Sequence, residues 1–143
     1  RAQRMLAGHR EITEQMRMEF VDTEGLSTPL TAEFEYDPAD PFAVSILFAD
    51  EPAPVRWTFA RDLLIEGFYE PTGDGDVHVW PCLNTQGAAV VILELSSPSG
   101  EVLVQVGSRE LSAFIHQMVA MVPQGAEGGL VDLDAEIAQL LSA

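Results

Sequence analysis

The sequence predicts an α+β domain in which two antiparallel meander sheets are connected by a short linking helix and followed by C-terminal helices. Seven short segments that turn residues separate read as strands, most of them from period-two alternation of apolar and polar residues. One later segment instead has apolar residues at helical spacing. No linker-like stretch or repeat divides the 143 residues. We therefore expect a single domain over residues 12–143, preceded by an N-terminal extension over residues 1–11.

Four alternating segments predict the first meander. In the segment that starts at Ile12, the apolar residues Met16, Met18 and Phe20 are each separated by one residue, as in a half-buried strand. The run Asp37–Pro41 contains two prolines and two aspartates, which favour a turn. The expected strands are residues 12–21, 30–36, 42–48 and 55–60.

A short helix and a second meander are expected next. Residues 61–66 read as a helix that Gly67 stops, and residues 71–75 read as a tight loop. Three further strands are expected at residues 76–81, 88–95 and 101–106.

The C-terminal third is expected to be helical. Ser108 is a suitable N-cap, and an apolar stripe of helical period runs from Leu111 to Val122. A last helix is expected to begin near Asp132. The stripe has to be buried against the protein's own sheet or against a neighbouring subunit, and we predict a homo-oligomer.

Charge excludes several classes of function. The chain has 7 Lys and Arg residues against 23 Asp and Glu residues, a formal net charge of −16. Nucleic-acid binders usually display a basic stripe, and anionic membranes attract basic segments, so neither partner is expected. No apolar run reaches the length of a membrane span, and no signal peptide is visible. The single cysteine, Cys82, is consistent with a reducing cytosol.

No catalytic or metal-binding constellation is apparent. His9, His78 and His116 fall in separate predicted elements, and Cys82 has no second cysteine at ligand spacing. Paired acids such as Glu33 and Glu35 are better explained as a solvated strand face. We therefore expect no enzyme activity, no metal and no cofactor.

An interaction surface remains as a candidate around the linking helix. One interpretation is a helix with a local ion pair above an aromatic core, and the other is an arginine-and-aromatic anchor for a second protein. The candidate positions are Arg61, Asp62, Glu66, Phe68, Tyr69 and Trp80.

Three segments carry a resemblance to a known family. They are YDPADPFAV (36–44), VRWTFARDLLIEGFYEPTGDGDVHVWP (55–81) and LELSSPSGEVLV (93–104), followed by a late acidic segment at 131–134. In this order and spacing they resemble the SsgA-like sporulation and cell-division proteins of actinomycetes, over roughly residues 14–141. The residues after the Trp80–Pro81 pair, beginning with Cys82, depart from the pattern of that family.

The resemblance implies a non-enzymatic factor of the cytoplasm, recruited to division septa, that controls septum formation during sporulation. It implies contacts with the division machinery, directly or indirectly with the tubulin-like GTPase FtsZ, and a Whirly-like fold assembled as an oligomer, with a trimer favoured. FtsZ is acidic as a rule, so a direct contact would gain no long-range steering from charge. The alternative is a single-stranded nucleic-acid-binding module that uses the Whirly-like sheet.

Overall fold

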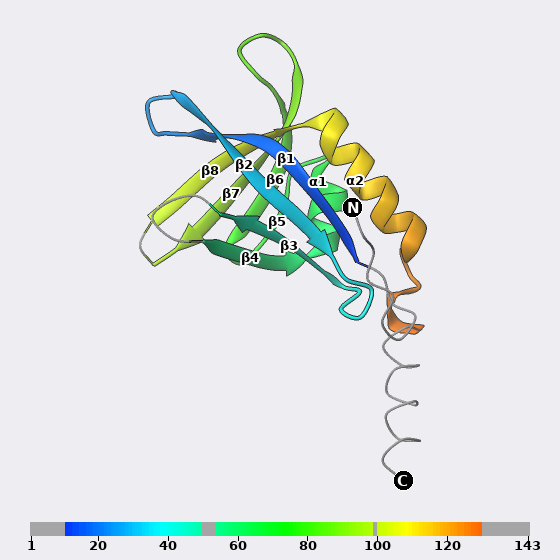
Figure 1. Ribbon diagram of the computed structural model, residues 1–143. Coiled ribbons are helices and arrows are strands. Elements are labelled where there is room, and N and C mark those ends of the chain that lie inside the picture. The colour runs from blue at the N-terminus through cyan, green and yellow to red at the C-terminus, as the bar shows by residue number, and fades with distance from the viewer. Residues whose placement is uncertain (1–10, 50–53, 99, 130–143) are drawn as a thin grey trace.

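Eight strands form one antiparallel sheet in the computed structural model, which describes residues 11–49, 54–98 and 100–129 (Figure 1). The sheet curls into a half-barrel around the core. Its strands are β1 (Ile12–Val21), β2 (Ser27–Tyr36), β3 (Ala43–Phe48), β4 (Val55–Ala60), β5 (Thr72–Asp74), β6 (Val77–Leu83), β7 (Ala89–Ser97) and β8 (Gly100–Gly107).

The α+β class is confirmed, but the prediction of two separate sheets is wrong. The strand order is β4-β3-β2-β1-β8-β7-β6-β5, so two meanders are present and are joined through β1 and β8. In that pair Met18 lies opposite Val106 and Val21 lies opposite Leu103. The alternation within a strand shows which residues face the core, but it does not show that the first and last strands pair across the chain.

Both helices lie on the inner face of the half-barrel (Figure 1). The short helix α1 (Arg61–Gly67) follows β4 directly and contacts β4, β5 and β6, so it lies between the two edge strands of the sheet. The longer helix α2 (Ser108–Met121) contacts β1, β7 and β8.

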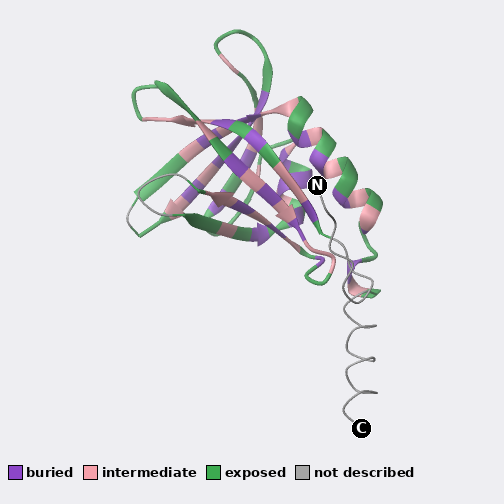
Figure 2. Ribbon diagram, in the orientation of Figure 1, coloured by how far each residue is buried: buried purple, intermediate pink, exposed green. Residues whose placement is uncertain are grey.

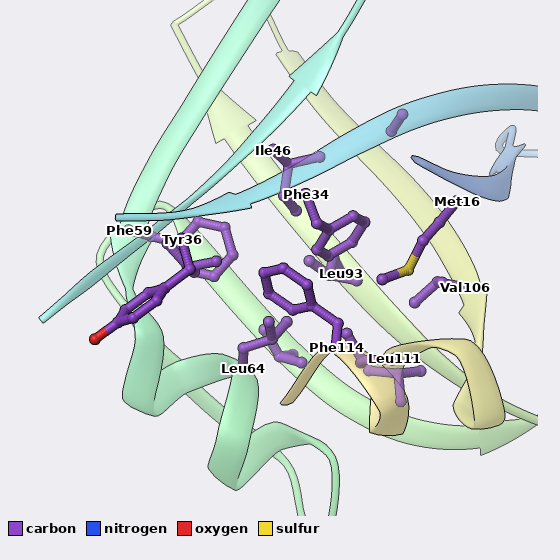
Figure 3. Packing of buried hydrophobic residues seen from close by; sticks show 14 of the residues in the cluster. Met16, Phe34, Tyr36, Ile46, Phe59, Leu64, Leu93, Val106, Leu111 and Phe114 are labelled. Atoms are coloured by element: carbon purple, nitrogen blue, oxygen red, sulfur yellow. The ribbon is translucent and has the colours of Figure 1, made fainter. Parts of the chain in front are cut away.

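The apolar stripe of α2 is buried in the protein's own core. Leu111, Phe114 and Met118 are fully buried. Figure 2 shows buried and exposed positions alternating along α2. The Phe114 ring meets the Phe34 ring edge-to-face, with centroids 5.5 Å apart, and Figure 3 shows both rings beside Leu93. The stripe was expected to be buried either against the protein's own sheet or against a neighbouring subunit, and the structure shows the first.

Three local expectations are corrected. Residues 72–74 of the expected loop form β5, because they pair with Val77–Val79. Helix α2 is capped by Gly107 without a side-chain hydrogen bond, so Ser108 is a helical residue and not the N-cap. Gly67 ends α1 without a left-handed conformation; it is needed because a Cβ there would overlap the side chain of Val79.

Two expectations fall outside the described residues. The helix expected from Asp132 lies in residues 130–143, and the expected N-terminal extension is described only at Glu11.

Candidate functional site

Arg61 is the most buried charged residue among the candidates, with no exposed surface. Its backbone N–H donates to the Phe42 carbonyl at 2.8 Å, which fixes the start of α1 beside β3. Its Nη1 donates to the Tyr36 hydroxyl at 3.3 Å, and its guanidinium carbon lies 5.4 Å from the centre of the Tyr36 ring. The Nε atom has no hydrogen-bond partner among the described residues.

The ion pair of Arg61 is not local. Its Nη2 lies 2.8 Å from Oε2 of Glu127, beyond the end of α2, and both side chains are buried. The other carboxylate oxygen of Glu127 accepts the backbone N–H of Gly125 at 2.8 Å. The pKa of Glu127 is lowered, first by the hydrogen bond from Arg61 and also by backbone N–H donors.

Tyr36 completes this buried cluster. Its hydroxyl donates to the Pro41 carbonyl at 2.9 Å while it accepts from Arg61. Burial raises the pKa of Tyr36, the Arg61 charge opposes this rise, and the carboxylates of Glu127, Asp40 and Asp37 add to it. The cluster ties β2, α1 and the segment after α2 together, which is a structural role.

The other candidates on or after α1 differ in their exposure. Asp62 and Glu66 are exposed, and Tyr69 is 77% exposed. Phe68 packs against the core, and its ring meets the Tyr69 ring edge-to-face at 5.1 Å. Tyr69 is the most exposed of the large apolar side chains that the structure describes, and with Asp62 and Glu66 it is open to contact.

Trp80 lies on the opposite face of the sheet from Arg61. Val77 and Val79 belong to the inner core, so alternation places Trp80 on the outer face of β6. Directly opposite Trp80 on β7 is Ile92, which is buried yet is not part of the core cluster. The six candidates therefore do not converge on one surface, and their role in partner contacts stays a prediction.

The outer face of β6, β7 and β8 carries a continuous set of apolar side chains, which we name the outer apolar patch. Val90 is 5% exposed and Ile92 is 9% exposed, although neither contacts the inner core cluster. The patch consists of Trp80, Cys82, Val90, Ile92 and Leu103.

A polar cleft of about 420 Å³ lies elsewhere, along β2, β3 and β4. Arg56 forms an ion pair with Glu35 in this cleft. The remaining lining residues are Glu11, Tyr36, Asp37, Asp40, Ala43 and Ser45. Over the described ranges no group of three or more His, Cys, Asp or Glu side chains is placed to hold a metal ion.

Sequence reasoning missed Tyr36, Glu127 and Ile92. Glu127 gave no signal, because a lone acid among glycines is an ordinary surface pattern. Tyr36 begins the segment YDPADPFAV that carries the family resemblance, but nothing in the sequence indicated its contact with Arg61. Ile92 did give a signal: residues 88–93 are apolar without interruption, which is typical of a strand with two apolar faces.

Within the described part of the chain, no helix is long and apolar enough to cross a bilayer.

Comparison with known protein families gives a consistent result. The family described as "Streptomyces sporulation and cell division protein, SsgA" matches residues 30–127. The chain is 44% identical over 140 residues to the sporulation-specific cell division protein SsgB of Frankia casuarinae, with 96% of each chain covered. It is 43% identical over 131 residues to SsgB of Streptomyces coelicolor, covering 90% of this chain and 93% of that one.

Solved structures share the fold over most of the chain. The crystal structure of an SsgA-like sporulation-specific cell division protein from Thermobifida fusca superposes with a TM-score of 0.84 at 34% identity, covering 94% of this chain and 98% of that chain. A structure from a study of SsgB mutations that correlate with longitudinal cell division during sporulation of Streptomyces coelicolor gives a TM-score of 0.80 at 40% identity, covering 85% of this chain and 96% of that chain.

Proposed function

Because this chain belongs to the SsgA-like family of sporulation-specific cell division proteins, we propose that it regulates and localises septum formation during sporulation-specific cell division. The observation that carries the proposal is the near full-length similarity to relatives named for this process, at 43–44% identity to two of them. The family is not known for enzymes, and we propose a non-enzymatic role for this chain as well.

The proposed mechanism is protein–protein contact with the division machinery at the septum, either with FtsZ directly or through another protein. The correlation of SsgB mutations with longitudinal division in Streptomyces coelicolor supports a role in placing the septum. The outer apolar patch contains Trp80, and tryptophan is one of the residue types that carry much of the binding energy at interface centres.

The proposal is tested by deleting the gene in the actinomycete that carries it and imaging fluorescent FtsZ during sporulation. We expect FtsZ ladders and sporulation septa to be lost or misplaced, and a copy of the gene to restore them. Regularly spaced ladders and septa in the deletion strain would contradict the proposal. A tagged, functional copy of the protein should also appear in the cytoplasm and then at septa.

We further propose a homo-oligomer, with a trimer favoured. The family resemblance supports this proposal, whereas the apolar stripe of α2 no longer does, because it is buried in its own subunit. Light scattering on the purified full chain at tens of micromolar checks it. A monomer mass would overturn the oligomer, and a dimer mass would overturn the trimer.

A further inference from the structure

We propose that the outer apolar patch is the docking surface for a partner protein that presents apolar side chains flanked by Lys or Arg. This inference deepens the proposed function, on which it rests, by specifying the chemistry of the direct partner. It concerns one half of the outer face of the sheet, a face that α1 and α2 leave uncovered because they pack on the inner face (Figure 1).

The strand register makes the patch continuous. Trp80 on β6 lies opposite Ile92 on β7, and Cys82 lies opposite Val90. Ile92 lies opposite Gln105 on β8, so Leu103, two residues away on the same face, is its diagonal neighbour. Leu103 in turn lies opposite Val21 of β1, which extends the apolar surface across a fourth strand.

The rest of the outer face has a different character. The outward positions of β2 are Thr31, Glu33 and Glu35, and those of β4 are Arg56 and Thr58. Ser45 of β3 and Thr58 of β4 are hydrogen-bonded through their hydroxyls at 2.8 Å. A sheet face that only meets water is expected to be mostly polar, as this half is apart from the partly buried Leu47 of β3. In the apolar half Val90 and Ile92 are already buried, so the apolar surface that another protein could contact is that of Trp80, Cys82 and Leu103.

Charge at the rim decides the kind of partner. Glu94, Glu101 and Glu19 each lie two residues from a member of the patch or from Val21, on the same face. The opposing charges are those of Arg17, two residues from Glu19, and of His78 when protonated, whose Nδ1 lies 3.6 Å from Glu94. The rim is thus acidic on a chain of net charge −16.

A second copy of the chain would bring the same acidic rim and the same net charge to the contact, so like charges would face one another. A partner protein whose surface has an apolar centre and a basic rim would match both the apolar side chains and the acidic rim of the outer apolar patch.

The experiment identifies the segment that touches the patch. A photoreactive residue is placed at the patch by Gln105→p-benzoylphenylalanine, and at the polar half by Thr58→p-benzoylphenylalanine, in the full chain within sporulating cells. Cross-linked peptides are sequenced by mass spectrometry. We expect position 105, and not position 58, to cross-link to a segment of another protein that contains apolar residues and more Lys and Arg than Asp and Glu.

The segment is then synthesised, and its affinity for the purified chain is measured by fluorescence anisotropy. Trp80→Ser and Leu103→Ser should each weaken binding about tenfold or more, as expected for central interface residues. The matched control is Leu47→Ser, which removes a partly buried leucine from the polar half of the same outer face. Circular dichroism on each variant shows that it is folded, and two patch variants are used so that one unfolded protein does not decide the result.

Four results would overturn the inference: cross-links to this same chain, cross-links to nucleic acid, a segment with an acidic excess, or no difference between positions 105 and 58. Equal affinity of the Trp80→Ser and Leu47→Ser variants would overturn it as well. None of these results depends on FtsZ imaging. Normal septation in the deletion strain would defeat the proposed function, whereas loss of septation together with an acidic or absent cross-link would defeat this inference alone.

Discussion

Arg61 and Glu127 lie 66 positions apart in the sequence, yet the guanidinium Nη2 donates to the carboxylate at 2.8 Å inside the protein. Because Arg61 is fully buried, loss of its partner leaves a charge that water cannot reach. We expect Glu127→Ala to lower the free energy of unfolding by about 3 kcal/mol, measured by urea denaturation. Glu66→Ala, at an exposed acid of α1, is the control and should change stability by less than about 0.5 kcal/mol.

The same pair predicts a specific result for its joint replacement. Arg61→Met combined with Glu127→Leu removes both charges and keeps apolar volume, so most of the stability lost in Glu127→Ala should return. A double variant as unstable as the single one would show that the contact of Glu127 with the Gly125 backbone, not the ion pair, provides the stabilisation.

Glu127 also makes stability depend on pH. Its pKa is lowered in the folded protein, so the unfolded chain takes up the proton first as the pH falls. The stabilisation is therefore complete above the ordinary glutamate pKa of about 4.3 and is lost as the pH falls through the lower, folded value. The gap in urea midpoint between the wild type and Glu127→Gln should shrink from pH 7 towards pH 3. A constant gap over this range would contradict the assignment.

Tyr36 is expected to act at the other end of the pH scale. Tyr36→Phe leaves the Pro41 carbonyl without the hydroxyl donor and the Nη1 atom of Arg61 without the hydroxyl acceptor, which costs about 1–3 kcal/mol. Since burial raises the pKa of Tyr36, its contribution is complete below pH 10 and is lost as the pH rises through the folded value. Stability curves of the wild type and Tyr36→Phe should therefore converge at strongly alkaline pH.

Features that depend on residues close together in the sequence were predictable, whereas features that join distant parts of the chain were not. Strands such as β1 and the helix α2 were predictable, because alternation and helical spacing are local and record which face is buried. The pairing of β1 with β8 was not, because it joins residues that no local period relates. The resemblance to the SsgA-like family carried the functional class, and the matching family confirms that class.

The candidate site was only partly predictable for the same reason. Trp80 was identified as a candidate from the sequence. Its neighbour Ile92 was not, because the two meet only through the pairing register of β6 and β7, which no local sequence pattern indicates. Arg61 was expected to form an ion pair within or near its own helix, and the alternative was that it anchors a second protein. It is instead buried against Glu127, because the chain after α2 returns to the start of α1.

Gly67 offers a sharp test of how α1 packs on β6. In an exposed helix, Gly→Ala raises stability by about 1 kcal/mol. At Gly67 the added Cβ would overlap the Val79 side chain, so we expect Gly67→Ala to destabilise by about 1–3 kcal/mol instead. Val79→Ala removes the Cγ atoms but keeps the Cβ that the added atom would also overlap, so Gly67→Ala should remain destabilising in that background. Gly128→Ala, where a Cβ meets open space, is the control.

Phe114 tests whether α2 belongs to its own subunit. Its ring is fully buried against Phe34, so Phe114→Ala should create a cavity and cost about 3–5 kcal/mol. His116→Ala, on the exposed side of the same helix, should change stability by less than about 0.5 kcal/mol. If α2 instead held subunits together, Phe114→Ala would change the mass measured by light scattering and make the unfolding midpoint depend strongly on protein concentration. We expect the unfolding free energy to fall and the mass of the folded fraction to stay unchanged, because every fully buried residue of the stripe packs against strands of its own chain.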